Sequence, residues 1–173
     1  EAKGKLYGYF GPTPALLRLP FVASGLAFGN LSRAAMLLYF GITLAAAYLL
    51  LREALRLTRI TDANPVPSRM ATVILLTATG WGSTVLFLGS RSLIFHEAIL
   101  GGIAFALISS FCTLRFIRWP ESRWWIGALV AGILSIHTRP PTGLFALTLL
   151  GCATVGLTVR KFRLSRARGT GFF

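Results

Sequence analysis

Charged residues divide this sequence into five long apolar stretches, which run over 34–51, 70–90, 98–114, 124–138 and 140–159. These stretches hold 18, 21, 17, 15 and 20 residues in that order. A helix crosses the hydrocarbon of a bilayer with about 20 residues, within a range of roughly 17 to 25. The fourth stretch is the short one, because at about 1.5 Å per residue it spans only about 22 Å. The pattern predicts an all-α, polytopic membrane protein with about five transmembrane helices, the fourth ending below the surface or beside a wet cavity.

The segment before these stretches has a different pattern. Residues 6–29 are apolar, but three prolines and four glycines interrupt them, which makes one straight helical span improbable. We therefore expect three regions in the chain. They are an outer-face or re-entrant segment with proline turns at 1–33, a five-helix transmembrane bundle at 34–159, and a basic cytoplasmic tail at 160–173.

Composition agrees with a membrane as the solvent. Of 173 residues, 54% are hydrophobic and only 13% are charged, where a soluble domain carries about a quarter. Disordered chains combine high charge with low hydrophobicity, so this composition excludes them. A nucleic-acid-binding patch belongs on a polar face, which this mostly apolar chain does not offer. The lipid bilayer is thus the expected partner, and nucleic acid is not.

The basic residues predict an orientation. Lys and Arg number 18 against 5 for Asp and Glu. If the five stretches alternate in direction, twelve of the basic residues fall on one side and six on the other. Cytoplasmic loops are enriched in Lys and Arg, so the sequence predicts the N-terminus outside and the C-terminus in the cytoplasm.

Nine residues of the predicted outer side are candidates for a binding site. They are basic, acidic or aromatic, and a positive site with aromatic side chains suits a phosphorylated lipid or a sugar better than a cation. The polar members are Arg18, Arg91, His96, Glu97, His137 and Arg139, and the aromatic members are Tyr7, Tyr9 and Phe10.

Two of these positions have competing interpretations. Glu97 could be stabilised by the helix dipole in a first turn and paired with Arg91, or could line a substrate cavity with His96. Arg139 could reach lipid phosphates at the membrane surface, or could hold a bound phosphate through its planar guanidinium. For His137 a hydrogen-bonded structural role is favoured over a functional one.

No motif assigns a catalytic residue. The sequence contains no nucleotide-binding loop, no metal-ligand spacing and no nucleophile motif, so neither a cofactor nor a divalent metal has support. Cys112 and Cys152 fall within apolar stretches, where they are interpreted as small apolar side chains.

Three short runs nevertheless resemble bacterial polytopic membrane glycosyltransferases of the GT-C superfamily. They are YGYFGPTPALLRLP from Tyr7 to Pro20, His96-Glu97-Ala98 at a predicted helix start, and TRPPTG from Thr138 to Gly143 between two predicted helices. The resemblance implies an enzyme of the bacterial inner membrane that uses a polyprenyl-phosphate-linked sugar at the outer face. It also implies that this stretch is an internal portion of such an enzyme, because the family's carboxylate base lies in a loop after a first helix. Glu97 is not assigned that role.

A different class of protein fits the same sequence. A non-catalytic membrane subunit, packed against other membrane subunits in a larger complex, also has five helices and needs no carboxylate base. A transporter is a weaker alternative, because the predicted spans carry their charges only at the ends and have no internal proline.

Overall fold

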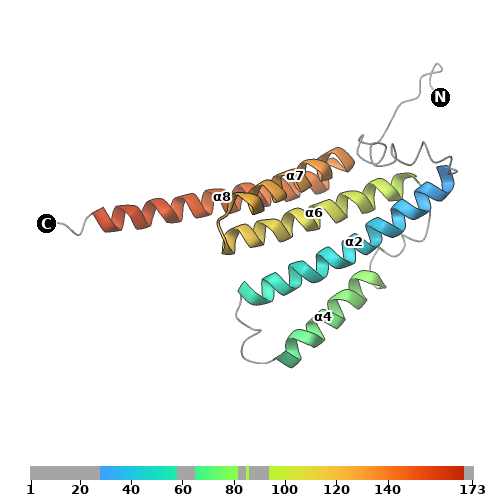
Figure 1. The fold of residues 1–173 in the computed structure, drawn as a ribbon, viewed down its shortest axis with the longest axis horizontal. Helices are drawn as coiled ribbons and strands as arrows, with labels where there is room; N and C mark the ends of the chain where they lie inside the picture. The colour runs from blue at the N-terminus through green and yellow to red at the C-terminus, as the bar shows by residue number, and fades with distance from the viewer. Residues whose placement is uncertain (1–27, 58–64, 82–84, 86–93, 170–173) are drawn as a thin grey trace, which may run out of the picture.

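The computed structural model describes residues 28–57, 65–81, 85 and 94–169, and every regular element among them is a helix. The helices are α2 (Phe28–Leu57), α4 (Pro65–Gly80), α6 (Ile94–Arg118), α7 (Ser122–Thr138) and α8 (Pro140–Gly169). They lie side by side in one elongated bundle, with α4 at one edge and α8 extending beyond the other helices (Figure 1). The predicted all-α class is confirmed.

Contacts between the helices fix their directions. Tyr39 of α2 lies beside Gly101 of α6, and Glu53 further along α2 pairs with Arg118, so these two helices run in parallel. Ser109 of α6 donates a hydrogen bond to the carbonyl of Ala128, and Ser135 of α7 donates to the carbonyl of Gly102, so α7 is antiparallel to α6. Helix α8 turns back again, because its start contacts the end of α7 and Thr154 far along it meets Trp125 near the start of α7.

The two ends of the bundle differ in their basic side chains. The arginine end is where α2 and α6 finish and α4 and α7 begin, and the junction end is where α6 and α8 begin and α7 finishes (Figure 1). Among the described basic side chains, Arg33 and Arg139 belong to the junction end. The others gather at the arginine end: Arg52, Arg56, Arg69, Arg115, Arg118, Arg123, Arg160, Lys161 and Arg163. The grouping of basic residues expected from an alternating bundle therefore holds, while the side that faces the cytoplasm stays a prediction.

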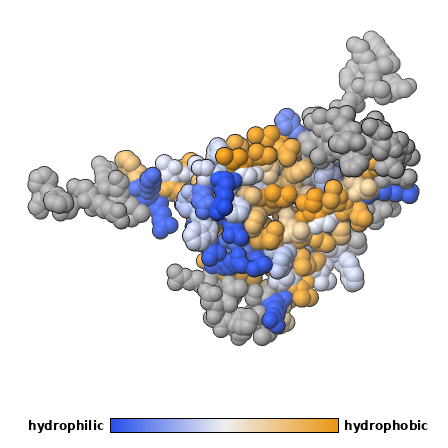
Figure 2. Space-filling model, in the orientation of Figure 1, coloured by the Kyte–Doolittle hydropathy of each residue, from blue (hydrophilic) through white to orange (hydrophobic). Residues whose placement is uncertain are grey.

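Helix α6 forms the centre of the bundle. It packs against α2, α7 and α8, and its apolar span is 61% buried, against 28% for α2 and 17% for α8. Tyr39, Leu100 and Ala104 lie in the core, where the Tyr39 ring meets Phe105 edge to face at 6.0 Å. On the face that Figure 2 shows, the surface between the two ends is largely hydrophobic. A core helix surrounded by apolar outer faces is the arrangement expected in lipid.

Three described helices are long and apolar enough to cross a membrane: Leu31–Leu57, His96–Arg118 and Pro140–Arg163. This confirms a membrane protein with transmembrane helices. The number of spans stays a prediction beyond these three. Helix α7 has 17 residues and is short, as its apolar stretch predicts.

Four observed helices extend further than their charge-free stretches. Helix α2 begins at Phe28 rather than at residue 34 and continues to Leu57, and α8 continues through part of the predicted tail to Gly169. The exception is α4, which begins at Pro65 and ends at Gly80, so the prediction of one helix over 70–90 is wrong; a glycine is a common helix end. The other helices are longer because charged side chains with long stems are good helix formers and reach the interface with their stems in lipid. Charges therefore mark the edge of the hydrocarbon and not the end of a helix.

Candidate functional site

Four of the nine predicted site residues lie in the described part of the chain, and all four are at the junction end. His96 and Glu97 are in the first turn of α6. His137 and Arg139 lie two residues apart, where α7 meets α8. The other five lie outside the described residues: Tyr7, Tyr9, Phe10, Arg18 and Arg91.

The turn between α7 and α8 follows directly from its sequence. Arg139 is extended, with φ −150° and ψ 108°, because a residue before proline avoids the helical region. Its N–H still donates to the carbonyl of Ser135 at 2.7 Å, which closes the last turn of α7. Pro140 and Pro141 then open α8, where the missing N–H groups would have no helical partner in any case. Arg139 is therefore the single residue that connects α7 to α8.

Hydroxyl groups connect this turn to α6. Ser135 donates a hydrogen bond to the carbonyl of Gly102 at 2.8 Å, and its oxygen lies 3.1 Å from Thr142 Oγ1. Thr142 in turn donates to the carbonyl of Arg139 at 2.8 Å. These bonds satisfy polar groups that apolar surroundings would otherwise penalise. They join α6, α7 and α8 at one point.

Gly102 allows this close approach. A Cβ at that position would lie 2.8 Å from Thr142 Oγ1 and 2.9 Å from the Cβ of Arg139. Small residues at such contacts let helix backbones meet within a membrane. The structure therefore brings the backbone of the TRPPTG run against α6, one to two turns from the His96-Glu97 pair.

Side chains at the junction end differ in exposure. Those of His137 and Arg139 are exposed, that of His96 is partly buried, and that of Glu97 is only 1% exposed. Glu97 also lies in the first turn of α6, where the helix dipole favours a negative charge. This observation fits the dipole interpretation of Glu97, whereas its suggested partner Arg91 is outside the described residues. The exposed Arg139 remains able to meet a phosphate of a lipid or a substrate.

Sequence reasoning missed a second buried carboxylate, Glu53, at the arginine end. Its position after the charge-free stretch at 34–51 predicts a link between helices, but it lies on α2 and its side chain is 1% exposed. Arg118 of α6 donates to Glu53 Oε1 at 3.2 Å. Arg115 Nε lies 3.3 Å from Oε2 but is misaligned for a hydrogen bond, and Arg56 Nη1 lies 3.5 Å from Oε2. One carboxylate thus holds three guanidinium groups from two helices.

Aromatic rings extend this cluster toward α7. The Arg115 guanidinium lies 5.1 Å from the centre of the Trp124 ring and 5.6 Å from that of Phe111. Arg118 lies 5.6 Å from the Trp119 ring. Arginine is attracted to ring faces at such distances. The spacing of Glu53 and Arg56, one helical turn apart, was the only part of this cluster that the sequence could have indicated.

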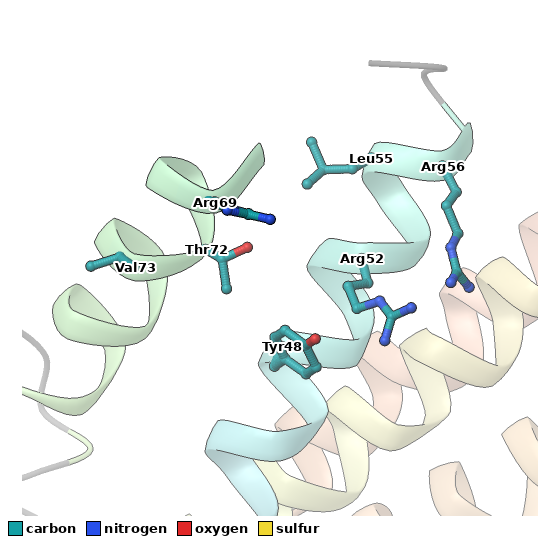
Figure 3. A pocket seen from close by; sticks show the side chains of 7 residues that line it. All are labelled: Tyr48, Arg52, Leu55, Arg56, Arg69, Thr72 and Val73. Carbon is teal, nitrogen blue, oxygen red and sulfur yellow. The ribbon is translucent and has the colours of Figure 1, made fainter. Parts of the chain in front are cut away.

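A pocket of about 500 Å³ opens beside this cluster, between α2 and α4. Figure 3 shows Arg69 and Thr72 extending from α4 into the gap, opposite Leu55 of α2. Arg52 contributes a third side of the pocket, with its guanidinium 5.7 Å from the centre of the Tyr48 ring. Among the ion pairs of the described residues, none involves Arg52 or Arg69. The pocket is therefore strongly positive.

Metal binding has no support in the described part of the chain, where His, Cys, Asp and Glu do not gather in groups of three or more. A comparison of the sequence and fold with protein-family models, curated proteins and solved structures gives no match.

Proposed function

We propose that this chain is part of an integral membrane glycosyltransferase that takes its sugar from a polyprenyl-phosphate donor at the outer membrane face. The observation that carries the proposal is the convergence at Gly102. There the TRPPTG run packs against the helix that begins with His96 and Glu97, so two of the three family-like runs share one end of the bundle. Arg139 and Thr142 both lie against Gly102, so the arginine proposed to meet the phosphate is one to two helical turns from His96 and Glu97.

In the proposed reaction an acceptor hydroxyl attacks the anomeric carbon of the sugar. The bond from that carbon to the lipid phosphate oxygen breaks, and the hydroxyl proton passes to a base. Negative charge grows on the departing phosphate, so a cation fixed nearby stabilises the transition state. Arg139 fits this role because it is exposed at the junction end and its backbone is held by the Ser135 and Thr142 bonds. Arg91 and Arg18 are proposed to assist it.

Replacing Arg139 with alanine in the full-length enzyme tests this role. Turnover is measured as release of polyprenyl phosphate from a panel of polyprenyl-phosphate sugars in proteoliposomes. We expect Arg139→Ala to lower turnover by about 100-fold, the loss typical of one transition-state contact. Arg33→Ala is the matched control, since Arg33 is also an exposed arginine of the junction end. Unchanged turnover in Arg139→Ala would reject the assignment.

A non-catalytic membrane subunit is the second candidate, and the surface of α8 favours it. Leu144, Phe145 and Val155 are exposed along this helix, whose apolar span is only 17% buried. Such a face meets either lipid or another membrane helix. Cys152 lies exposed on α8 and provides a site for cross-linking in native membranes. Stoichiometric cross-linking to one partner, together with no turnover on any donor, would favour the subunit.

A further inference from the structure

We propose that the crevice between α2 and α4 binds one anionic glycerophospholipid, with its phosphate at the arginine end and an acyl chain along the two helices. This site is separate from the junction end and does not depend on the proposed enzymatic function.

The phosphate would meet a pocket built for an anion. Arg52 of α2 and Arg69 of α4 line it from different helices, whereas the Arg56 guanidinium is directed to Glu53, on the side of α2 away from α4 (Figure 3). Tyr48 and Thr72 supply hydroxyl groups at the same place. Guanidinium groups suit phosphate oxygens because their planar donors bind two oxygens at once.

Positive charge in this region exceeds the negative charge of the carboxylates in the described part of the chain. Glu53 already faces Arg56, Arg115 and Arg118, which leaves one negative charge against three positive ones. Arg52 and Arg69 form no ion pair with any described carboxylate. An anionic headgroup at the membrane surface would reduce this excess, and basic pockets between transmembrane helices are known to attract such headgroups.

An apolar hollow of about 270 Å³ follows on the same crevice, one helical turn from the pocket. Leu44 of α2 and Leu76 of α4 line it, and Trp81 lies at its far side with 80% of its surface exposed. From Arg52 to Phe40 the crevice is about 18 Å long at about 1.5 Å per residue. One leaflet of hydrocarbon is about 15 Å thick, so a phosphate near Arg52 leaves the upper part of an acyl chain beside the hollow and the rest of the chain in the surrounding lipid.

The position of α4 lets lipid reach the crevice. Helix α4 lies at the edge of the bundle, beside α2 and away from α7 and α8 (Figure 1). The hollow is therefore reached from outside the bundle, and Trp81, which lines it, is 80% exposed.

Competition between two lipids tests the proposal. The full chain in detergent micelles is mixed with equal amounts of phosphatidylglycerol and phosphatidylcholine that carry the same acyl chains. Native mass spectrometry then counts the lipid retained. We expect one phosphatidylglycerol to be retained in preference to phosphatidylcholine, and excess inorganic phosphate not to displace it. Equal retention of both lipids, or displacement by inorganic phosphate alone, would overturn the proposal.

Two variants locate the site. Arg52→Gln with Arg69→Gln should weaken phosphatidylglycerol binding by about thirtyfold, since each arginine near a headgroup contributes about a factor of five. Arg160→Gln with Lys161→Gln removes the same charge from the exposed surface of α8 and should change binding less than about twofold. An equal loss in both double variants would mean general surface attraction and would reject the pocket.

A further variant tests whether an acyl chain occupies the apolar hollow. It also tests the proposal if the double arginine variant fails to fold. Thr77→Trp places a large side chain in the hollow beside Leu76, at an exposed position far from the arginines. We expect it to lower phosphatidylglycerol retention while preserving helicity. Retention equal to that of the unmodified protein would show that no acyl chain occupies the crevice.

Discussion

The two ends of the bundle each bury a carboxylate, but they hold their helices together by different means. At the arginine end Glu53 gathers three guanidinium groups, whose side chains are 28 to 36% exposed. At the junction end glycine contacts and hydroxyl bonds join α6, α7 and α8. The first arrangement tolerates movement because long side chains can follow it. The second tolerates less movement, because short hydroxyl side chains and close glycine contacts hold the helices there.

This difference suits two depths in a membrane. Ion pairs are possible where charged heads reach the interface, and the arginine end has aromatic rings of the kind found there, including Trp119 and Trp124. Close contacts between helix backbones do not need water, so they still stabilise helix packing inside the hydrocarbon. Four predictions test the contrast, beginning with the largest expected effect.

Gly143→Ala should be the most damaging change. A Cβ there would overlap the backbone nitrogen and Cα of Ile136, so α7 and α8 would have to separate. We expect the free energy of unfolding to fall by about 3 kcal/mol, as measured by loss of helical circular dichroism during titration with SDS. Gly151→Ala on the same helix has nothing within 4 Å of the new Cβ and should be neutral or slightly stabilising. Similar losses in the two variants would contradict backbone contact as the cause.

Glu53→Gln should produce the next largest effect, at the other end. It leaves three neighbouring guanidinium groups without their shared carboxylate. Breaking a buried pair costs several kcal/mol, but the partly exposed arginines can turn to water, so we expect a loss of about 2 kcal/mol. The control is Glu121→Gln, whose half-exposed carboxylate pairs with Arg123 and should contribute less than about 0.5 kcal/mol. A loss as small as the control's would show that Glu53 does not hold this end together.

Neither of the two largest effects could be predicted from the sequence. Charge-free stretches predicted four of the helices, the short α7 and the break at Pro140, because these depend on local composition and backbone chemistry. Glu53 looked like a loop residue, since two of its three partners lie on α6, more than 60 residues further along the chain. Gly143 and Gly151 look alike in sequence, and only the packing of α8 against α7 distinguishes them. Tertiary neighbours, which no local pattern encodes, decide both cases.

Ser135→Ala should cost about 1 kcal/mol at the junction end, because it removes the bond to the Gly102 carbonyl between α7 and α6. The matched control is Ser110→Ala. Its hydroxyl is equally buried but donates only to Ala106 of its own helix, at 2.9 Å. The carbonyl of Ala106 keeps its helical N–H partner, so we expect the control to lose less. The same SDS titration compares the two, and equal losses would mean that the hydroxyl adds nothing to helix association.

A higher salt concentration should have the smallest effect on the free energy of unfolding, and that effect should come from the arginine end alone. Raising NaCl from about 0.1 M to 1 M shortens the Debye length from about 10 Å to 3 Å, which weakens partly exposed ion pairs. We expect the unmodified protein to lose about 0.5 kcal/mol, since the arginines around Glu53 reach the solvent. Ser135→Ala should lose the same amount, because the bond it lacks carries no charge. Glu53→Gln should lose nothing, because salt then screens only repulsion between arginines. Salt sensitivity that persists in Glu53→Gln would place the responsible charges elsewhere and remove the distinction between the two ends.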